Sequence, residues 1–348
     1  MNRIRNQLRI ATVVPVYNTD LYLEECLDAI LAQSYQNFDI YFINDASTDK
    51  SKDILEYYQS KDSRLHLYNT SKNGGVAKAR NVALELIEKN GNYDFICFLD
   101  SDDIVTNDYF ESIIQNFTSY NSDCLIVGYH SFDKRQQHLP DRTQKTIPFE
   151  LDQDNAYKFC FGFGGFSQKE FSSISLSLGN MAFKAKVVKG IRFNENLKTA
   201  EDQDYILKCL SRSNRLIVDN NIYYFYRIRN SSLTNSNRIR MSDIDAFLHW
   251  TIKPYDMSII CRKTVEHLAF QNFWRIIREA EKENKLTSLW SDLKTRLWIM
   301  KKTFITDELS SRKSKKRIFI FNLGRFAVSS YLKITQKNSN KGQTNGFD

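Results

Sequence analysis

Three aspartates stand within four positions directly after a short apolar run. Residues 95–99 read Phe-Ile-Cys-Phe-Leu, and Asp100, Asp102 and Asp103 follow them. Such a run is typical of a buried parallel strand, and open α/β sheets bind ligands at the carboxyl ends of their strands. Carboxylates this close repel one another unless a cation or a set of donors compensates them, and Mg²⁺ and Mn²⁺ prefer oxygen ligands completed by substrate phosphates. The segment predicts either a metal–phosphate site or a solvated acidic loop that caps the next helix.

The sequence around these aspartates alternates strand and helix patterns. Apolar, β-branched runs predict strands at residues 10–16, 38–43, 64–68, 95–99 and 124–129. Helical spacing of apolar residues predicts helices between them, and this order indicates an α/β fold with a mainly parallel sheet and right-handed crossovers. The pattern weakens from residue 131 to about 174, where we expect mobile loops and an irregular insert. Ordered patterns resume at residue 180, and residues 222–226 predict an aromatic strand.

Length and charge indicate two parts. A chain of 348 residues suggests about two domains, which we place at residues 1–235 and 236–348, with an insert at about 131–200. The six cysteines are scattered and form no metal or disulfide pattern, and the N-terminus has no signal-peptide pattern, which favours a cytoplasmic protein. The net charge is +8, but the Lys and Arg residues before position 309 are balanced by acids. A neutral body argues against a nucleic-acid-binding protein.

The C-terminal region reads as helices that end in a basic tail. Helical spacing covers residues 265–283 and 286–303, and residues 309–347 contain nine Lys or Arg residues and no acid. The helical pattern at 318–334 is apolar on most sides. We expect the amphipathic helix at 318–334, within the basic tail of residues 309–341, to lie in an anionic membrane interface beside the basic run 312–317. The alternative is an ordinary helix that docks on the body beside a solvated basic linker.

Polar motifs stand at the ends of successive predicted strands. In chain order they are Pro15-Val-Tyr17-Asn18, Asn44-Asp45, Asn73-Gly74-Gly75 with Arg80 behind it, Asp100-Ser101-Asp102-Asp103, Glu201-Asp202, and Arg227-Ile-Arg229-Asn-Ser231. In this order and spacing, residues 8–235 resemble the family 2 glycosyltransferases, which have the Rossmann-like GT-A fold. The resemblance implies a GT-A domain followed by a helical extension.

The resemblance also implies a nucleotide-diphosphate sugar donor, most often linked to uridine. Pro15, Tyr17 and Asn18 would pack on the uracil, and Asp45 would accept its imide N–H. Asn73 and Gly74 would offer backbone amides to a ribose or phosphate, although a helix-entry turn fits them as well. Arg80 would touch a phosphate or steady the acids. Asp100 and Ser101 would face the ribose, and a loop with Arg227, Arg229 and Ser231 would close over the diphosphate, with a loop salt bridge as the competing interpretation.

The catalytic roles implied by the resemblance fall on three carboxylates. Asp102 would bind Mn²⁺ or Mg²⁺, which neutralises charge on the departing diphosphate, and Asp103 would lie behind it or near the acceptor. No histidine is placed to complete the metal shell. Asp202 would be the general base of an inverting transfer, with Glu201 orienting it or holding an acceptor hydroxyl. The plainer interpretation of Glu201 and Asp202 is a pair of acids favoured by a helix N-terminus.

These expectations define a function with one rival. We expect an enzyme that adds a sugar to a saccharide or lipid-linked saccharide of a bacterial surface glycan, such as lipopolysaccharide or capsule. It would act at the inner face of the plasma membrane, held there by the basic tail. The alternative is an inactive nucleotide-sugar-binding subunit with the same fold. The sequence does not identify the sugar, the acceptor or the oligomeric state.

Overall fold

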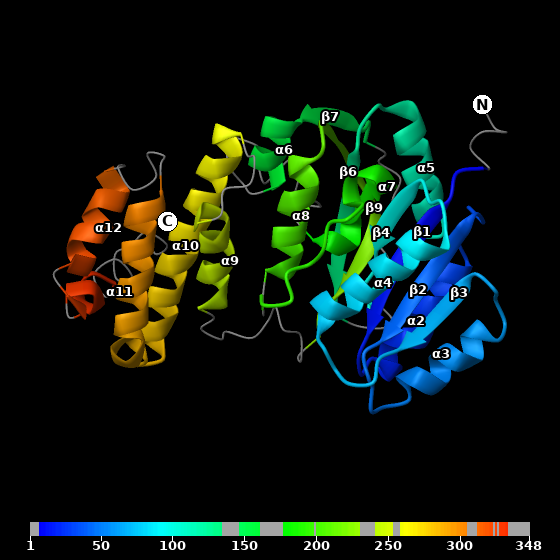
Figure 1. Cartoon of the computed structure of the whole chain (residues 1–348), viewed down its shortest axis with the longest axis horizontal. Coiled ribbons are helices and arrows are strands. Elements are labelled where there is room, and N and C mark those ends of the chain that lie inside the picture. The colour runs from blue at the N-terminus through cyan, green and yellow to red at the C-terminus, as the bar shows by residue number, and fades with distance from the viewer. Residues whose placement is uncertain are drawn as a thin grey trace, which may run out of the picture. The chain divides into compact units, whose positions relative to one another are not determined.

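The structure is a computed structural model. It describes residues 7–133, 146–160, 177–197, 200–229, 241–252, 258–304, 312–322, 324–325 and 327–332. The chain divides into two compact units, Met1–Asn235 and Ser236–Asp348. Figure 1 labels the strands and helices of both units.

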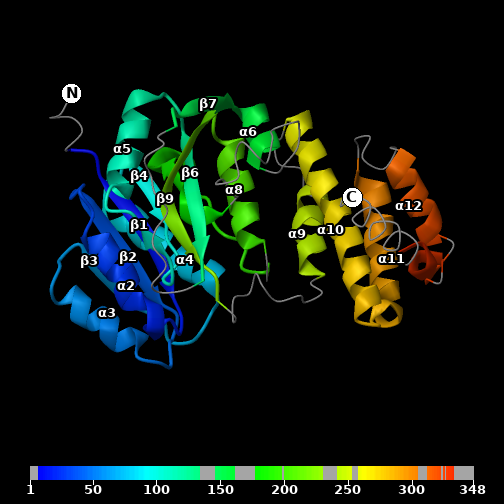
Figure 2. The same ribbon diagram turned by 180° about the vertical axis from the view of Figure 1, so that it is seen from behind.

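Four parallel strands form one half of the sheet in the first unit. They lie in the order β3 (Leu65–Asn69), β2 (Phe38–Asn44), β1 (Ile10–Val16) and β4 (Phe95–Phe98). Nearly all side chains of β1, β2 and β4 are buried, as the apolar runs predict. Figure 2 shows these strands side by side from behind. The helices that connect them are α2 (Asp20–Leu31), α3 (Ser51–Gln59) and α4 (Val76–Asn90).

The other half of the sheet is mixed in direction. Strand β8 (Met181–Lys184) lies antiparallel between β4 and β6 (Cys124–Phe132), and β9 (Arg215–Arg227) pairs parallel with β6. The short strand β5 (Ile104–Val105) pairs antiparallel with β9. The order of patterns along the chain could not indicate that a later strand inserts beside β4, because that pairing is set by long-range packing. The remaining helices of this unit are α5 (Tyr109–Ser119), α6 (Gln153–Cys160), η1 (Leu178–Asn180), α7 (Ala185–Val188) and α8 (Glu201–Ser211).

The expectation of an irregular insert after residue 131 is wrong for its described part. Strand β7 (Phe149–Asp152) pairs antiparallel with the start of β9, and α6 follows it directly. The Gln153 side chain then donates to the carbonyls of Leu210, Ser211 and Ser213 at the end of α8. These long-range contacts order a segment whose local pattern is weak. Residues 134–145 and 161–176 lie outside the described residues.

The second unit is a group of helices around an aromatic core. It contains α9 (Ser242–Ile252), α10 (Ile259–Lys282), α11 (Leu286–Thr303) and α12 (Arg312–Asn322). Its buried side chains include Trp274, Ile277, Leu293 and Leu297, while Trp290 is partly buried. Within the described part of the chain, no helix is both long and apolar enough to cross a membrane.

The tail does not form the single helix expected at residues 318–334. Helix α12 begins at Arg312, so the basic run lies inside it, and the helix ends at Asn322 shortly before Gly324, whose φ is +103°. Phe321 is buried and stacks on Trp290 with ring centroids 4.4 Å apart, and Val328 is fully buried. Some of the apolar residues expected to face a membrane therefore pack within the helical unit, whereas Phe319 is 63% exposed. Residues 333–348 lie outside the described residues.

Candidate active site

The carboxyl ends of β1, β2 and β4 lie at one edge of the sheet because these strands are parallel and adjacent. Residues 15–18 end β1, Asp45 follows β2, and Asp100 to Asp103 follow β4. Folding thus gathers three of the predicted motifs, which are distant in sequence, at the edge where such sheets bind ligands.

Arg80 joins two of the acidic motifs. It comes from α4, only 5% of its surface is exposed, and its Nη2 lies 2.9 Å from Asp100 Oδ1. Its Nη1 lies 3.3 Å from Glu201 Oε1, at the first residue of α8. The buried Nε of Arg80 has no hydrogen-bond partner among the described residues. A single guanidinium therefore brings the acids after β4 together with the acids that begin α8.

The segment before Glu201 is fixed by the residue next to Arg80. The Asn81 side-chain amide donates to the Phe193 carbonyl at 3.1 Å and accepts from the Phe193 amide at 2.8 Å. The Phe193 ring stacks on Tyr205 of α8 with centroids 3.9 Å apart, and the Arg80 guanidinium lies 5.4 Å from the Phe193 ring centroid. Ala200, directly before Glu201, has a left-handed backbone with φ of 60°. Helix α4 thereby holds the position from which α8 starts.

Glu201 and Asp202 sit in an environment suited to a proton acceptor. Burial raises the pKa of Asp202 above its ordinary value, while the positive charge of Arg80 opposes that rise. Burial and the charge of Asp202 raise the pKa of Glu201 in the same way. The Asp202 carboxylate accepts the Gln203 amide at 2.7 Å. A carboxylate with a raised pKa is a stronger base than one in water.

Asp102 and Asp103 have different partners. Oδ2 of Asp102 lies 2.6 Å from Nε of Arg229, and both side chains are partly buried. Burial and the neighbouring charge of Asp100 raise the pKa of Asp102 to about 6, against the opposing effect of Arg229. Asp103 is buried, accepts the Arg227 amide at 2.8 Å and accepts the Tyr224 hydroxyl, so it is tied to β9. Asp103 is thus held by β9, whereas Asp102 pairs with Arg229, which lies beyond the end of β9.

Arg227 is buried behind the acidic loop and is already paired. Only 4% of its surface is exposed. Its Nε donates to the Asp102 carbonyl at 2.7 Å, and its Nη2 lies 2.6 Å from Glu25 Oε2. The guanidinium also packs over the rings of Tyr22 and Phe132, at 5.1 and 4.5 Å. Arg227 thus holds the backbone of the acidic loop in place, which corrects the role expected from the sequence.

The loop Asn73-Gly74-Gly75 has no free amides at its glycines. The Gly74 amide donates to both carboxylate oxygens of Asp45 at 3.0 Å, and the Gly75 amide donates to Oδ2 at 2.7 Å. Thr70 Oγ1 lies 3.0 Å from Oδ1 of Asp45. This corrects the expectation of amides open to a ribose or phosphate, because the buried carboxylate of Asp45 has taken them. A nucleotide N–H that reaches Asp45 would have to compete with the loop.

The residues at the end of β1 that are predicted to bind the nucleotide are exposed or half-buried, whereas Ser101 is buried. Tyr17 is 47% exposed, Asn18 is exposed and Pro15 is half-buried. Asn18 has φ of 51°, and its Oδ1 accepts the Thr48 amide at 2.8 Å, which fixes the loop after β1 against the loop after β2. Ser101 is buried with its hydroxyl 3.0 Å from Thr19 Oγ1. Ser101 therefore supports the loop and does not face a ligand. Ser231 lies outside the described residues.

Sequence reasoning missed the residues that hold the site from behind. They are Tyr22, Glu25, Asn81 and Tyr224. The one available signal is that Tyr22 and Glu25 stand three apart on a predicted helix and so share a face. Gly179 was missed as well. A Cβ at this position would collide with the Tyr224 ring, and the sequence contains no signal of this close contact.

If a divalent cation binds here, Asp102 would be its single ligand from the described part of the protein. No group of three or more His, Cys, Asp or Glu residues in the described ranges is arranged to hold a metal. The raised pKa of Asp102 reflects burial and repulsion by Asp100, and a cation would relieve that repulsion. Arg229 occupies Asp102 Oδ2 at 2.6 Å. The donor set therefore suits an ion that takes its other ligands from a phosphate and water, once Arg229 has moved away.

The described residues form an α/β domain with a group of acids at the carboxyl edge of its sheet, and comparison with known proteins identifies its family. The profile described as Glycosyl transferase family 2 matches residues 12–189, about half of the chain. The chain belongs to this family.

Curated relatives and solved structures extend the comparison. Glycosyltransferase GlyA of Streptococcus pneumoniae is 34% identical over 226 residues, which are 65% of this chain and 31% of GlyA. Poly(ribitol-phosphate) beta-N-acetylglucosaminyltransferase TarS of Staphylococcus aureus is 26% identical over 224 residues, 63% of this chain and 35% of TarS. The chain thus spans about a third of the length of these relatives.

Two solved structures share the fold. The structure of TarS 1–349 in complex with UDP-GlcNAc superimposes with a TM-score of 0.61 at 21% identity and covers 88% of this chain and 92% of that one. A mannosyltransferase from Pyrobaculum calidifontis in complex with GDP-Man and Mn²⁺ has a TM-score of 0.55 at 14% identity, with coverage of 94% and 88%. The predicted GT-A-type α/β fold followed by helices is confirmed.

Proposed function

We propose that the chain is an inverting glycosyltransferase that uses a UDP-linked sugar as donor. The observation that carries the proposal is the Arg80 bridge, which brings the acids after β4 and the acids of α8 into one site at the carboxyl edge of the sheet. Family membership supports a glycosyl transfer, and the TarS structure with UDP-GlcNAc supports a uridine nucleotide.

In the proposed reaction, Asp202 removes the proton from an acceptor hydroxyl as its oxygen attacks the anomeric carbon of the donor. Attack from the face opposite the departing nucleotide inverts the configuration. Glu201 is held by Arg80, so its carboxylate can orient Asp202 or the acceptor hydroxyl. Burial raises the pKa of Asp202, which strengthens it as a base for this step.

The donor would bind along the strand ends. Tyr17, with half of its surface exposed, offers a ring face to the uracil, beside Pro15 and Asn18. Asp45 would recognise the base only by exchanging one of its loop amides for the nucleotide N–H. Asp100, with a side chain 33% exposed, would contact the ribose. Arg229 and the loop that follows it would face the diphosphate.

A divalent cation, Mn²⁺ or Mg²⁺, would be held by Asp102 and would offset the negative charge of the departing nucleotide. The mannosyltransferase complex with Mn²⁺ supports this choice. In its absence Arg229 compensates Asp102, at 2.6 Å. Asp103, tied to β9, keeps the loop in position.

Because Arg229 and a cation would compete for Asp102, removing the guanidinium should favour the cation. We expect Arg229→Ala to bind Mn²⁺ about tenfold more tightly than the wild type in the absence of donor. The same variant should lose transferase activity, because Arg229 would no longer reach the diphosphate. Calorimetric titration of the donor-free protein with Mn²⁺ measures the first effect, and Lys61→Ala, in the exposed turn after α3, is the control. Unchanged or weaker Mn²⁺ binding would rule out the competition.

The acceptor we propose is a phosphate-containing surface glycan, made at the inner face of the plasma membrane. According to its name, TarS acts on poly(ribitol-phosphate). Phosphate-containing polymers of this kind are therefore candidate acceptors, in addition to lipopolysaccharide and capsule. The exposed Lys315 and Lys316 of α12 could contact anionic lipid headgroups. The electrostatic part of such contact would weaken with salt, and the exposed Phe319 of the same helix could add an apolar part.

A donor screen tests the proposal. The full chain is heated with each of a panel of nucleotide sugars, with and without Mn²⁺, and the unfolding midpoint is measured. We expect one UDP-sugar to raise the midpoint by a few degrees, and about three degrees or more at a concentration of 100 times Kd, because a ligand of the native state stabilises it by mass action. Slow release of UDP in the same mixture, and faster release with acceptor, would distinguish an enzyme from an inactive binding subunit. No shift with any nucleotide sugar would overturn the proposal.

A further inference from the structure

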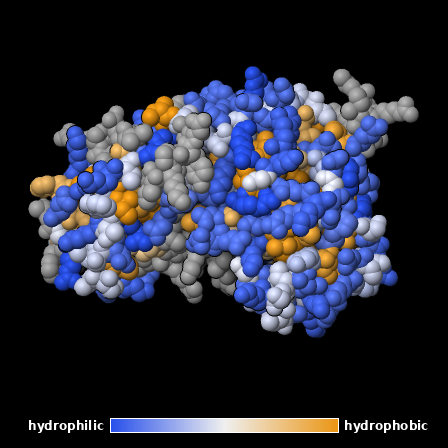
Figure 3. Space-filling model, viewed as in Figure 1, coloured by the Kyte–Doolittle hydropathy of each residue, from blue (hydrophilic) through white to orange (hydrophobic). Residues whose placement is uncertain are grey.

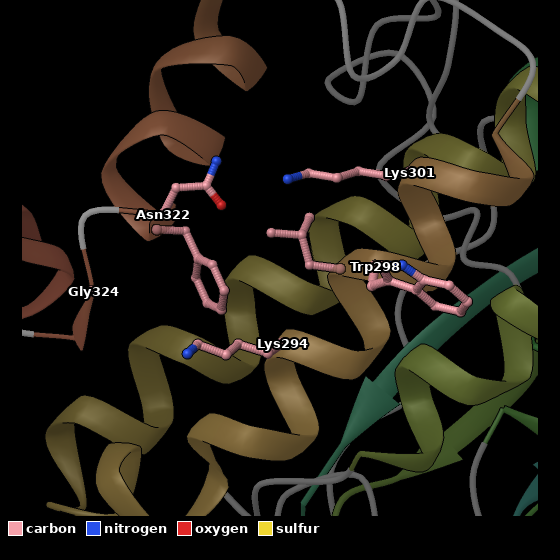
Figure 4. A pocket seen from close by; sticks show the side chains of 7 residues that line it. Lys294, Trp298, Lys301, Asn322 and Gly324 are labelled. Atoms are coloured by element: carbon pink, nitrogen blue, oxygen red, sulfur yellow. The ribbon is translucent and has the colours of Figure 1, made fainter.

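Helices α11 and α12 line a half-open pocket that the proposed catalytic site does not use. It has a volume of about 330 Å³ and lies wholly within the helical unit. Its lining is Lys294, Leu297, Trp298, Lys301, Phe321, Asn322 and Gly324. Figure 4 shows Lys301 extending from α11 toward the side of the pocket where Asn322 of α12 lies.

The two lysines of the pocket are available to a ligand. Both are exposed, and none of the described carboxylates lies within ion-pair distance of either ammonium group. Arg296, on another face of the same helix, is by contrast paired with Asp245 at 2.7 Å. Helices α11 and α12 carry four and five Lys or Arg residues against the single Asp292. The pocket therefore lies in the most positive part of the described chain and favours an anionic ligand.

Trp298 adds an aromatic surface to the face of α11 that carries the two lysines. It follows Lys294 by four positions and precedes Lys301 by three, so the three side chains share one face of α11. Trp298 is 60% exposed, while Leu297 and Phe321 beside it are each 3% exposed. An exposed Trp next to a buried apolar floor is typical of a binding surface, since its ring is large, rigid and amphipathic.

This arrangement selects among anionic ligands. A rise of 1.5 Å per residue places the Cα atoms of Lys294 and Lys301 about 10 Å apart, so the two ammonium groups can contact separate phosphates of one chain while Trp298 packs on the sugar or polyol between them. A membrane fits less well, because the surface is concave and Phe321, the apolar residue of α12 that lines it, is already buried. On the face of the molecule in Figure 3, the described residues form a mostly hydrophilic surface with small hydrophobic patches and no continuous apolar band.

We propose that the α11–α12 pocket binds a phosphodiester-linked glycan or polyol chain, as a docking site for the acceptor polymer. This inference rests on the proposed function for its biological meaning, but the binding itself does not depend on catalysis. The pocket would hold a remote part of the chain, so it would lower the KM for a long acceptor without changing kcat.

The test measures binding of synthetic poly(glycerol phosphate) to the full chain by calorimetry at moderate salt. We expect Trp298→Ala and the double variant Lys294→Gln/Lys301→Gln each to weaken binding by about tenfold. The matched control is Lys52→Gln/Lys61→Gln, which removes the same charge from exposed positions of the first unit and should leave binding unchanged. Trp298→Phe should retain most of the affinity, since it keeps a ring at this position.

The outcomes separate the two proposals. Equal losses in the pocket and control variants would mean non-specific attraction and would overturn the pocket, as would unchanged binding in Trp298→Ala. If Trp298→Ala instead abolished binding to phosphatidylglycerol vesicles and left polymer binding unchanged, the pocket would be a lipid site and the inference would be wrong. Failure of the donor screen with intact, Trp298-dependent polymer binding would overturn the glycosyltransferase proposal alone.

Discussion

Replacing Asp202 by asparagine is expected to lower kcat by roughly a thousandfold, because general-base catalysis contributes about 10²–10⁴. Asparagine keeps the shape of the side chain and can still accept the Gln203 amide, but it cannot take a proton from the acceptor. Donor binding, measured by thermal shift, should be unchanged. The measurement is the initial rate of UDP release at saturating donor and acceptor.

The control for Asp202→Asn must separate catalysis from helix stabilisation. Asp53 is an exposed acid in the first turn of α3, so Asp53→Asn removes a comparable interaction with a helix N-terminus outside the site. We expect Asp53→Asn to retain full activity. If Asp202→Asn retained more than about a tenth of the wild-type rate, the carboxylate would be a helix-capping acid and not the base.

The pH dependence gives a second check on the same residue. Asp202 acts only when ionised, and burial raises its pKa. The activity should therefore be full above this raised pKa and fall as the pH drops through it, at a higher pH than for an ordinary aspartate near 4. The acid limb of kcat/KM for the free enzyme reports this pKa. A limb at or below pH 4 would contradict the assignment.

The sequence predicted those parts of the fold in which local pattern and burial agree. The strands at Ile10–Val16 and Phe38–Asn44 are apolar and buried along nearly their whole length, so their pattern alone identifies them. The antiparallel position of β8 and the ordering of β7 depend on pairing with strands distant in sequence, which a local pattern does not contain. The same limit applies to the tail, where the burial of Phe321 is decided by Trp290 and Phe273.

Within the site, the sequence indicated the acids better than their partners. Asp100, Asp102, Glu201 and Asp202 lie where a strand end and a helix start predict them. The two arginines of the last motif have the same charge and stand two apart, yet Arg227 is buried and Arg229 pairs with Asp102. Residues two apart on a strand share a face, so strand geometry would place both arginines alike. They differ because β9 ends at Arg227 and Arg229 lies beyond it. Spacing alone could not decide this.

Removing the guanidinium of Arg80 should destabilise the first unit by about 3 kcal/mol, within the range for breaking a buried ion pair. Arg80→Ala would leave Asp100, Glu201 and Asp202 as neighbouring acids without their shared cation. Arg80 lowers the pKa of Asp202 and of Glu201, so the variant should have both pKa values further raised. The stability deficit should then be full at neutral pH and shrink as the pH falls through these raised pKa values, because protonation removes the repulsion.

The effect on activity should follow from the same geometry, because Arg80 connects α4 to the start of α8 and so fixes where Asp202 stands. We expect kcat of Arg80→Ala to fall about a hundredfold and its acid limb to move to higher pH. Arg80→Lys keeps the charge but lacks the planar fork that reaches two carboxylates, so it should restore stability in part and activity little. Urea unfolding measures the change in the free energy of unfolding. The matched control is Lys52→Ala, which breaks the exposed Lys52–Glu56 pair. If Arg80→Ala were as stable and as active as the wild type, the two groups of acids would act independently, and the site would not be the single unit on which the proposed transfer depends.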